Sequence, residues 1–175
     1  MGRHVALLRA VNVGGRKLPM AELRALCADI GWTDVATYIA SGNIVFTAEG
    51  SGEALEERLE KAIRDRFGMD VPVVVRSAAE WRDYAPANPF PGAAREKPNW
   101  LLMILAKRPP AAGAEDVIQA RAMGEEVRRA GDAIWINFAG GSGVSKVTPA
   151  VIDKAIGSPA TSRNHNTVVK LGEML

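Results

Sequence analysis

The chain has 175 residues, of which 47% are hydrophobic and 24% are charged, with a formal net charge of +2. This composition is typical of a globular protein and excludes a disordered or fibrous chain. The 22 basic and 20 acidic residues are too evenly balanced to indicate nucleic-acid binding by charge alone. The length allows either one ordinary domain or two small ones.

A single cysteine, Cys27, can form no internal disulfide, which favours a reducing compartment and therefore the cytoplasm. The apolar stretch at the N-terminus is too short for a signal peptide and is followed by no small-residue cleavage pattern. No apolar run approaches the ~20 residues that a helix needs to cross a bilayer. We therefore expect a cytoplasmic protein that does not enter a membrane.

The first half predicts six elements in the order β-α-β-β-α-β over residues 3–76. Each strand is a short run of β-forming residues, and each helix has an apolar stripe at helical spacing and a glycine at its end. The strands are expected at residues 4–11, 35–40, 44–47 and 71–75, and the helices between Pro19 and Gly31 and between Ser51 and Gly68. This order is that of the ferredoxin-like unit, an antiparallel sheet with two helices on one face. We assign the chain to the α+β class.

Four of the ten prolines lie between residues 86 and 98, and we expect no regular element there. We predict a first subdomain at 1–85 that ends in a short helix over 77–85, a proline-rich linker at 86–98, and a second α+β subdomain at 99–175. In the second subdomain we expect the order β-α-β-β-α-α, with no residue-level repeat of the first. Its elements are a strand at 100–106, a helix at 114–123, a hairpin over 125–138, a short helix begun by Thr148 and Pro149, and a last helix capped by Asn164 or Ser162.

Six segments together resemble the bacterial DUF1697 family. They are LLRAVNVGG (7–15), MAELRAL (20–26), TYIASGNIVF (37–46), ANPF (87–90), GVSK (143–146) and ATSRNHNTVVKL (160–171). They cover nearly the whole chain in order, and the one departure is His165, where a bulky aromatic residue is common. The resemblance implies a two-part α+β fold with a ferredoxin-like first subdomain. It transfers no catalytic residues, since none are agreed for the family.

The glycine loop after the first strand is the first candidate ligand site. Glycines there let backbone N–H groups turn toward one point, and the following helix adds positive potential at its N-terminus. This arrangement fits a cradle for a phosphate or carboxylate, although the spacing is not that of a Walker loop. An ordinary tight turn with solvated basic residues explains the same pattern. The residues concerned are Arg9, Asn12, Gly14, Gly15, Arg16 and Lys17.

Two further loops carry polar groups that could contact a ligand. Ser41 and Asn43 flank Gly42 at the predicted hairpin tip, where the same residues also satisfy the needs of a turn. Ser145 and Lys146 follow Gly143 and Val144 in a glycine-flanked loop that could bind an anion. Ser145 and Lys146 could also act as nucleophile and base, but adjacent side chains rarely face each other well enough for that chemistry.

The fourth candidate is the run of seven polar residues from Thr161 to Thr167 that precedes the last helix. One helix cap does not require so many polar residues, and Arg163 and Lys170 would add charge while Asn164 and Asn166 would add amides. An over-capped helix end is the competing explanation. Neither His4 nor His165 has cysteine or carboxylate partners at ligand spacing, and we expect no metal site and no cofactor.

The favoured function is the binding of a small anionic molecule, a phosphate or carboxylate, at a cleft between the subdomains where these loops would converge. Nucleic-acid binding through the first sheet is one alternative, although only Phe46 could stack on a base. An uncharacterised hydrolase or transferase is the other, and the sequence leaves open whether the protein is an enzyme. A homodimer could form through an edge strand such as the fourth.

Overall fold

The computed structural model describes residues 1–138, 140 and 145–175, and the chain divides into two compact units. The first unit comprises Met1–Arg82 together with Leu171–Leu175, and the second comprises Asp83–Lys170. The C-terminal residues group with the first unit, where Arg3 donates a hydrogen bond of 2.8 Å to the carbonyl oxygen of Met174. The sequence predicts that these residues belong to the second subdomain. Their position in the chain does not reveal that they contact the first unit.

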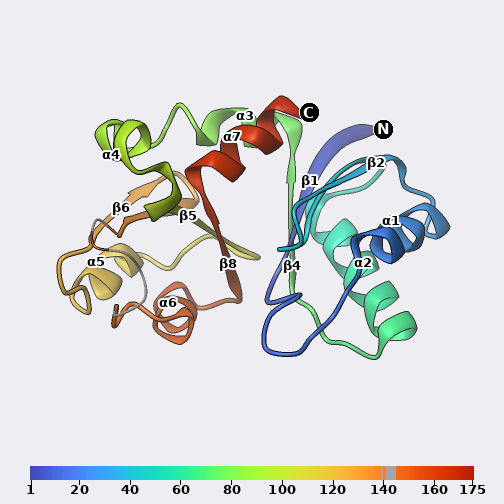
Figure 1. Ribbon diagram of the computed structural model, residues 1–175, viewed down its shortest axis with the longest axis horizontal. Coiled ribbons are helices and arrows are strands. Elements are labelled where there is room, and N and C mark those ends of the chain that lie inside the picture. The colour runs from blue at the N-terminus through green and yellow to red at the C-terminus, as the bar shows by residue number, and fades with distance from the viewer. Residues whose placement is uncertain (139, 141–144) are drawn as a thin grey trace. The chain divides into compact units, whose positions relative to one another are not determined.

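The first unit has the predicted ferredoxin-like order (Figure 1). Its sheet has the strand order β2-β3-β1-β4, and all three strand pairs are antiparallel. The fourth strand, β4, lies at an edge of this sheet, as the sequence predicts. The elements are β1 (Gly2–Leu8), α1 (Met20–Asp29), β2 (Thr33–Tyr38), β3 (Asn43–Ala48), α2 (Gly52–Phe67) and β4 (Val73–Ser77), followed directly by α3 (Ala78–Tyr84).

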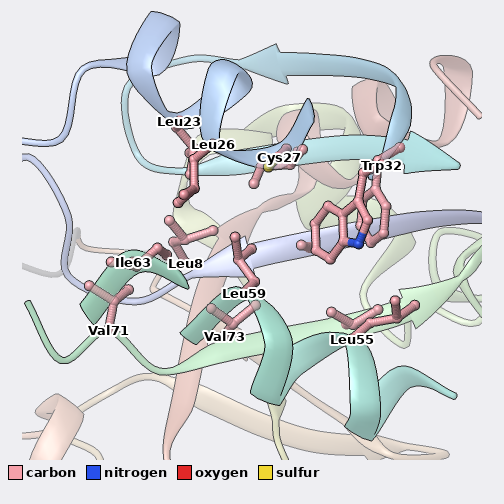
Figure 2. Packing of buried hydrophobic residues seen from close by; sticks show 14 of the residues in the cluster. Leu8, Leu23, Leu26, Cys27, Trp32, Leu55, Leu59, Ile63, Val71 and Val73 are labelled. Carbon is pink, nitrogen blue, oxygen red and sulfur yellow. The ribbon is translucent and has the colours of Figure 1, made fainter. Parts of the chain in front are cut away.

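A single apolar core lies between this sheet and the helices α1 and α2 (Figure 2). Leu23, Leu26 and Cys27 enter it from α1, and the aliphatic side chains of α2 that enter it fall at helical spacing. Phe46 on β3 is fully buried and stacks on Trp32, with 3.8 Å between the ring centroids. Because Phe46 is enclosed, it offers no face on which a base could stack.

The helix boundaries follow the expected local signals. Ser51 caps α2 by accepting a hydrogen bond from the N–H of Ala54, and Gly68 ends it in the left-handed conformation with φ of +65°. Pro19 precedes α1 as its N-cap instead of occupying the first turn. The first strand ends at Leu8, three residues earlier than predicted, because Ala10 and Asn12 have φ of +52° and +55°.

The proline-rich segment contains regular structure, and the prediction of an irregular linker there is wrong. A short helix, α4 (Pro91–Glu96), and a 3-10 turn, η1 (Pro98–Trp100), occupy it. Each begins with a proline, a position where the missing N–H costs nothing and the fixed φ suits the helix. The spacing of Pro91 and Pro98 therefore marks two helix starts.

The second unit repeats the topology of the first. After α4 and η1, its elements are β5 (Leu101–Ala106), α5 (Ala114–Gln119), β6 (Glu126–Ala130), β7 (Ala133–Asn137), α6 (Pro149–Ile156) and β8 (Ala160–Asn164). The last helix, α7 (His165–Glu173), begins in this unit, and its residues from Leu171 onward group with the first. Its sheet has the order β6-β7-β5-β8, which matches β2-β3-β1-β4 strand for strand. The core of this unit lies between the sheet and the helices α5 and α6.

The strand β8 was not predicted. The run from Thr161 to Thr167 was expected to precede the last helix as a polar loop, but residues 160–164 pair with β5 from Leu102 to Ala106. With this strand included, the second half reads β-α-β-β-α-β-α, as the first half does when α3 is counted. The repeat is therefore visible in strand order although no residue-level repeat is apparent in the sequence.

Candidate functional site

Two of the four predicted loops meet in the first unit, at an edge formed by residues 9–18 and by the hairpin turn 39–43, which we call the loop edge. Asn12 joins them through its side chain amide. Its Nδ2 donates to the carbonyl oxygens of Leu18 (3.0 Å) and Ala40 (2.6 Å), and its Oδ1 accepts from the N–H of Leu18 (2.9 Å). The Asn12 side chain thus closes the glycine loop and ties it to the hairpin.

Gly42 brings the hairpin turn against the end of the first strand. Its carbonyl oxygen accepts a hydrogen bond of 2.8 Å from the N–H of Leu8. A Cβ at residue 42 would lie 2.7 Å from Val11 Cγ2 and 2.8 Å from Leu8 Cβ, and φ at this residue is +84°. Glycine is therefore required here both for backbone conformation and for close approach.

Backbone strain is concentrated on the loop edge. Among the described residues, four other than glycine have positive φ, and three of them, Ala10, Asn12 and Ile39, lie on this edge. For the β-branched Ile39, with φ of +50°, this conformation is a genuine outlier. Such strain persists only where the surrounding contacts impose it, and it clusters at functional sites.

The glycine pair forms a tight turn at the tip of this loop. Gly14 and Gly15 have φ of +57° and +83°, and the N–H of Arg16 bonds to the oxygen of Val13 at 3.1 Å, as in a type I′ turn. Within the described part of the chain, no group accepts a hydrogen bond from the N–H of Gly14 or Gly15. Their N–H groups are exposed and open to water or to a ligand.

The charged residues of the loop edge differ in how they are held. One guanidinium nitrogen of Arg16 donates to the carbonyl oxygen of Asp70 at 2.7 Å, which fixes the side chain. Lys17 is exposed, whereas Arg9 is half-buried and its backbone N–H bonds to the oxygen of Pro72. Lys17 and the remaining N–H groups of Arg16 are therefore the cations that a ligand can reach.

The predicted binding role of Asn43 finds a structural explanation instead. Its side chain is buried, and its Nδ2 donates to the oxygen of Tyr38 (2.8 Å) and to Ser41 Oγ (3.0 Å). These bonds close the hairpin turn. Ser41 itself is exposed and lies on the loop edge.

In the second unit, Ser145 and Lys146 do not form a catalytic pair. Ser145 Oγ accepts a hydrogen bond of 3.0 Å from the N–H of Val147, and a hydrogen bond from this hydroxyl lowers the pKa of Glu125. Lys146 is exposed and pairs with no carboxylate among the described residues. Gly143 and Val144 lie outside those residues. The serine is thus engaged in local structure, and no base is aimed at it there.

Arg163 lies inside the second unit, since it belongs to β8 and not to a loop. Its Nη1 donates to Thr161 Oγ1 (2.8 Å) and to the oxygen of Ser162 (2.7 Å). Burial lowers the pKa of this guanidinium to about 10. The expectation that Arg163 presents its charge to a ligand from a polar loop is therefore wrong.

The asparagines around the start of α7 form a small amide cluster with a residue that the sequence analysis missed. Asn164 caps α7 by accepting from the N–H of Thr167 at 2.9 Å, as one of the two predicted caps. The Nδ2 of Asn166 donates to Asn99 Oδ1 at 2.9 Å, and the Nδ2 of Asn164 reaches the same oxygen at 3.5 Å. Asn99 precedes Trp100 in the proline-rich segment, and only the pairing of β5 with β8 reveals its neighbours.

The predicted site residues thus fall into two groups. Ser145, Lys146, Arg163, Asn164, Asn166 and Lys170 belong to the second unit, and the others belong to the first. A single cleft that would join both groups stays a prediction. Lys170 is exposed on α7.

The described residues give no sign of a metal centre. Across residues 1–138, 140 and 145–175, no three His, Cys, Asp or Glu side chains gather as metal ligands would. Burial raises the pKa of the Cys27 thiol to about 12 and lowers the pKa of His165. In the same residues, no helix has both the length and the apolar character needed to span a membrane.

Comparison with known proteins gives a family and a structural relative. The family model described as "Protein of unknown function (DUF1697)" matches residues 1–135. The structure of a conserved bacterial protein from Streptococcus pneumoniae, SP0830, is similar to this chain with a TM-score of 0.71 and 26% identity, over 100% of this chain and 98% of that one. None of the curated proteins matches this chain.

Proposed function

Because the chain belongs to the DUF1697 family, whose description assigns no activity, we propose its function from its own residues: it binds a small anionic molecule at the loop edge of the first unit. The proposal rests above all on the side chain of Asn12. Its three hydrogen bonds hold the glycine turn in place before any ligand arrives. A site that is ordered in advance loses less entropy on binding.

The ligand class follows from the groups that the turn presents. The N–H groups of Gly14 and Gly15 are donors, and Lys17 and Arg16 supply positive charge within three residues of them. Backbone N–H groups and cations gathered at one loop favour a phosphate or a carboxylate. Val13 and Ile39 are 56% and 51% exposed on the same edge and would contact an apolar part of the ligand.

The compartment is part of the proposal. With one cysteine, buried in the core of the first unit, the protein needs no oxidising environment. We place it in the cytoplasm, where phosphorylated and carboxylated metabolites are abundant.

Thermal unfolding of the full chain in the presence of inorganic phosphate tests the proposal. A ligand that binds only the native state raises Tm. We expect phosphate to raise Tm relative to chloride at equal ionic strength, and we expect Lys17→Gln to reduce that rise. Lys154→Gln, which removes an equally exposed cation from the second unit, is the matched control.

Amide chemical shifts locate the interaction. Phosphate should perturb the N–H signals of Gly14 and Gly15 in the wild type and much less in Lys17→Gln. Equal stabilisation of both lysine variants, or shifts spread over the basic residues of the whole surface, would overturn the proposal in favour of a nonspecific salt effect.

A further inference from the structure

The second unit contains a cavity of about 220 Å³ that no predicted residue lines. Its walls come from Gly92, Ala93 and Glu96 of α4, from Lys97 directly after that helix, and from Asn137 at the end of β7. Pockets for drug-sized ligands usually enclose ~300–1,000 Å³, so this one suits a single ring system. A carboxylate, an ammonium group and an amide line it together.

An exposed tryptophan adjoins this cavity. Trp100 is 40% exposed, and the Nζ of Lys97 lies 4.7 Å from the centroid of its ring. The carbonyl oxygen of Trp100 accepts a hydrogen bond of 2.9 Å from the N–H of Phe138, the residue after Asn137. This backbone bond fixes Trp100 beside the end of β7, where Asn137 lines the cavity. Because the ammonium of Lys97 lies over the ring, a base would stack on the part of the indole surface that stays exposed.

The neighbouring amide cluster is incompletely satisfied. Asn99 uses its Oδ1 to accept from Asn166, which leaves its Nδ2 group and the Oδ1 of Asn166 without a partner in the part of the chain that the structure describes. One is a donor and the other an acceptor. Both belong to exposed side chains, and Asn99 is the residue directly before Trp100.

From these observations we infer a second binding site, one for the purine base of a nucleoside, with the base stacked on Trp100. A donor and an acceptor side by side match the edge of an adenine ring, which presents an amino group next to a ring nitrogen. Stacking on an aromatic side chain strengthens the binding of a base in such sites. Lys97 and Glu96 line the same cavity and can contact the ribose or substituents on the ring.

This inference is independent of the anion site. It uses residues of the second unit alone, and the ligand that it names carries no charge when the nucleoside has no phosphate. Adenosine is therefore the appropriate probe. Inorganic phosphate, which tests the loop edge, should not compete for this site.

Isothermal titration of the full chain with adenosine is the decisive measurement. We expect saturable binding, an affinity reduced about tenfold or more by Trp100→Ala as one stacking contact is lost, and a smaller reduction in Trp100→Phe, which retains a ring. Asn99→Ala should also weaken the binding of adenosine, and it should reduce the ratio of the affinity for adenosine to the affinity for uridine. Val117→Ala, at an exposed apolar residue of α5, is the control for the second unit.

Two results would overturn the inference. One is the absence of adenosine binding to a wild-type chain whose unfolding is cooperative. The other is binding that Trp100→Ala and Asn99→Ala leave unchanged while circular dichroism shows both variants folded. Lys17→Gln should not affect adenosine binding, and a loss of adenosine binding in that variant would place the nucleoside at the loop edge instead.

Discussion

The Oε1 of Glu56 on α2 accepts a hydrogen bond of 2.9 Å from the backbone N–H of Val75 on β4. One turn along α2, Glu60 does the same for Val73 at 2.8 Å, and Glu80 does so for Ser77 at 2.7 Å. These three N–H groups belong to alternate residues of β4 and point away from β1, because successive N–H groups of a strand point to opposite sides. Carboxylates thus occupy the donors that a further strand would need, and they oppose strand addition at β4.

Removal of the Glu56 carboxylate should destabilise the first unit strongly. Glu56 is buried and lies 3.9 Å from the guanidinium of Arg76, so Glu56→Ala leaves the Val75 N–H without its acceptor and removes a carboxylate that pairs with a buried cation. We expect a loss of about 3 kcal/mol in the free energy of unfolding, measured by urea denaturation. Glu57→Ala changes the exposed neighbour on the same helix and should cost little. A similar loss in both variants would show that helix propensity, and not the edge contact, is responsible.

The second repeat lacks the equivalent of Glu56. Asp153 on α6 accepts from the N–H of Ala160 at 3.1 Å, as Glu60 does from Val73, but Pro149 stands four residues earlier, where the first repeat has a glutamate. No side chain among the described residues accepts from the N–H of Ser162. An edge-to-edge homodimer would therefore form more readily through β8 than through β4, the edge strand expected from the sequence.

The sequence predicted those elements whose signals are local. Ser51 and Gly68 bound α2, and the apolar runs of β1, β3 and β4 need no distant contact to be recognised. The strand β8 was not recognised, because residues 160–164 are polar. Their one large side chain, Arg163, was expected to be exposed and is buried. Its pairing with β5, more than fifty residues away, determines its conformation, and no local pattern encodes that pairing.

The candidate sites show the same limit. The glycine loop and the hairpin tip were both recognisable from residue type, yet their meeting depends on the hydrogen bond between Asn12 and Ala40. Asn99 and Trp100 gave no functional signal, since the four tryptophans are spread along the chain and indicate packing. Only the fold places them beside Asn137 and Asn166.

Asn12→Ala should loosen the loop edge. The substitution removes three hydrogen bonds and puts alanine at φ of +55°, where asparagine is better tolerated. We expect a loss of about 2 kcal/mol in the free energy of unfolding and faster hydrogen exchange at the Leu18 N–H. Asn12→Gly suits the backbone but lacks the amide, so it should show the fast exchange with a smaller loss of stability. Unchanged exchange in both variants would contradict the bracing role of the side chain.

Gly42→Ala should be more damaging than the same change at Gly14. Both residues have positive φ, but a Cβ at residue 42 meets Leu8 and Val11, whereas a Cβ at residue 14 meets nothing within 4 Å. We expect Gly14→Ala to cost about 1 kcal/mol for the left-handed backbone alone. Gly42→Ala adds the clash, for a total of about 2–4 kcal/mol. Equal shifts of the urea midpoint in the two variants would mean that the hairpin turn moves away without cost.

Acid should weaken the contact between Glu80 and Ser77. Partial burial acts to raise the pKa of Glu80, but hydrogen bonds from Ser77 and the charge of Arg76 outweigh it, and the pKa lies below its usual value of 4.5. A carboxyl group with a lowered native pKa stabilises the fold above its unfolded pKa, and that stabilisation is lost as the pH falls through the native pKa. The difference in unfolding free energy between wild type and Glu80→Gln should therefore be constant near neutrality and should shrink below about pH 4.5. A difference that persists at low pH would assign the effect to packing.

Cys27 should be inert in the native protein. Its thiol is fully buried on the core face of α1, and burial raises its pKa to about 12, so the thiolate that reacts with disulfide reagents is almost absent near pH 8. We expect a colorimetric disulfide reagent to label the native chain only as fast as it unfolds, and to label it at once in denaturant. A Glu56→Ala chain, which should unfold more often, is expected to react faster under native conditions, whereas Glu57→Ala should match the wild type. Rapid labelling of the native wild type would show that α1 opens independently of the sheet, and would remove Cys27 from the rigid core.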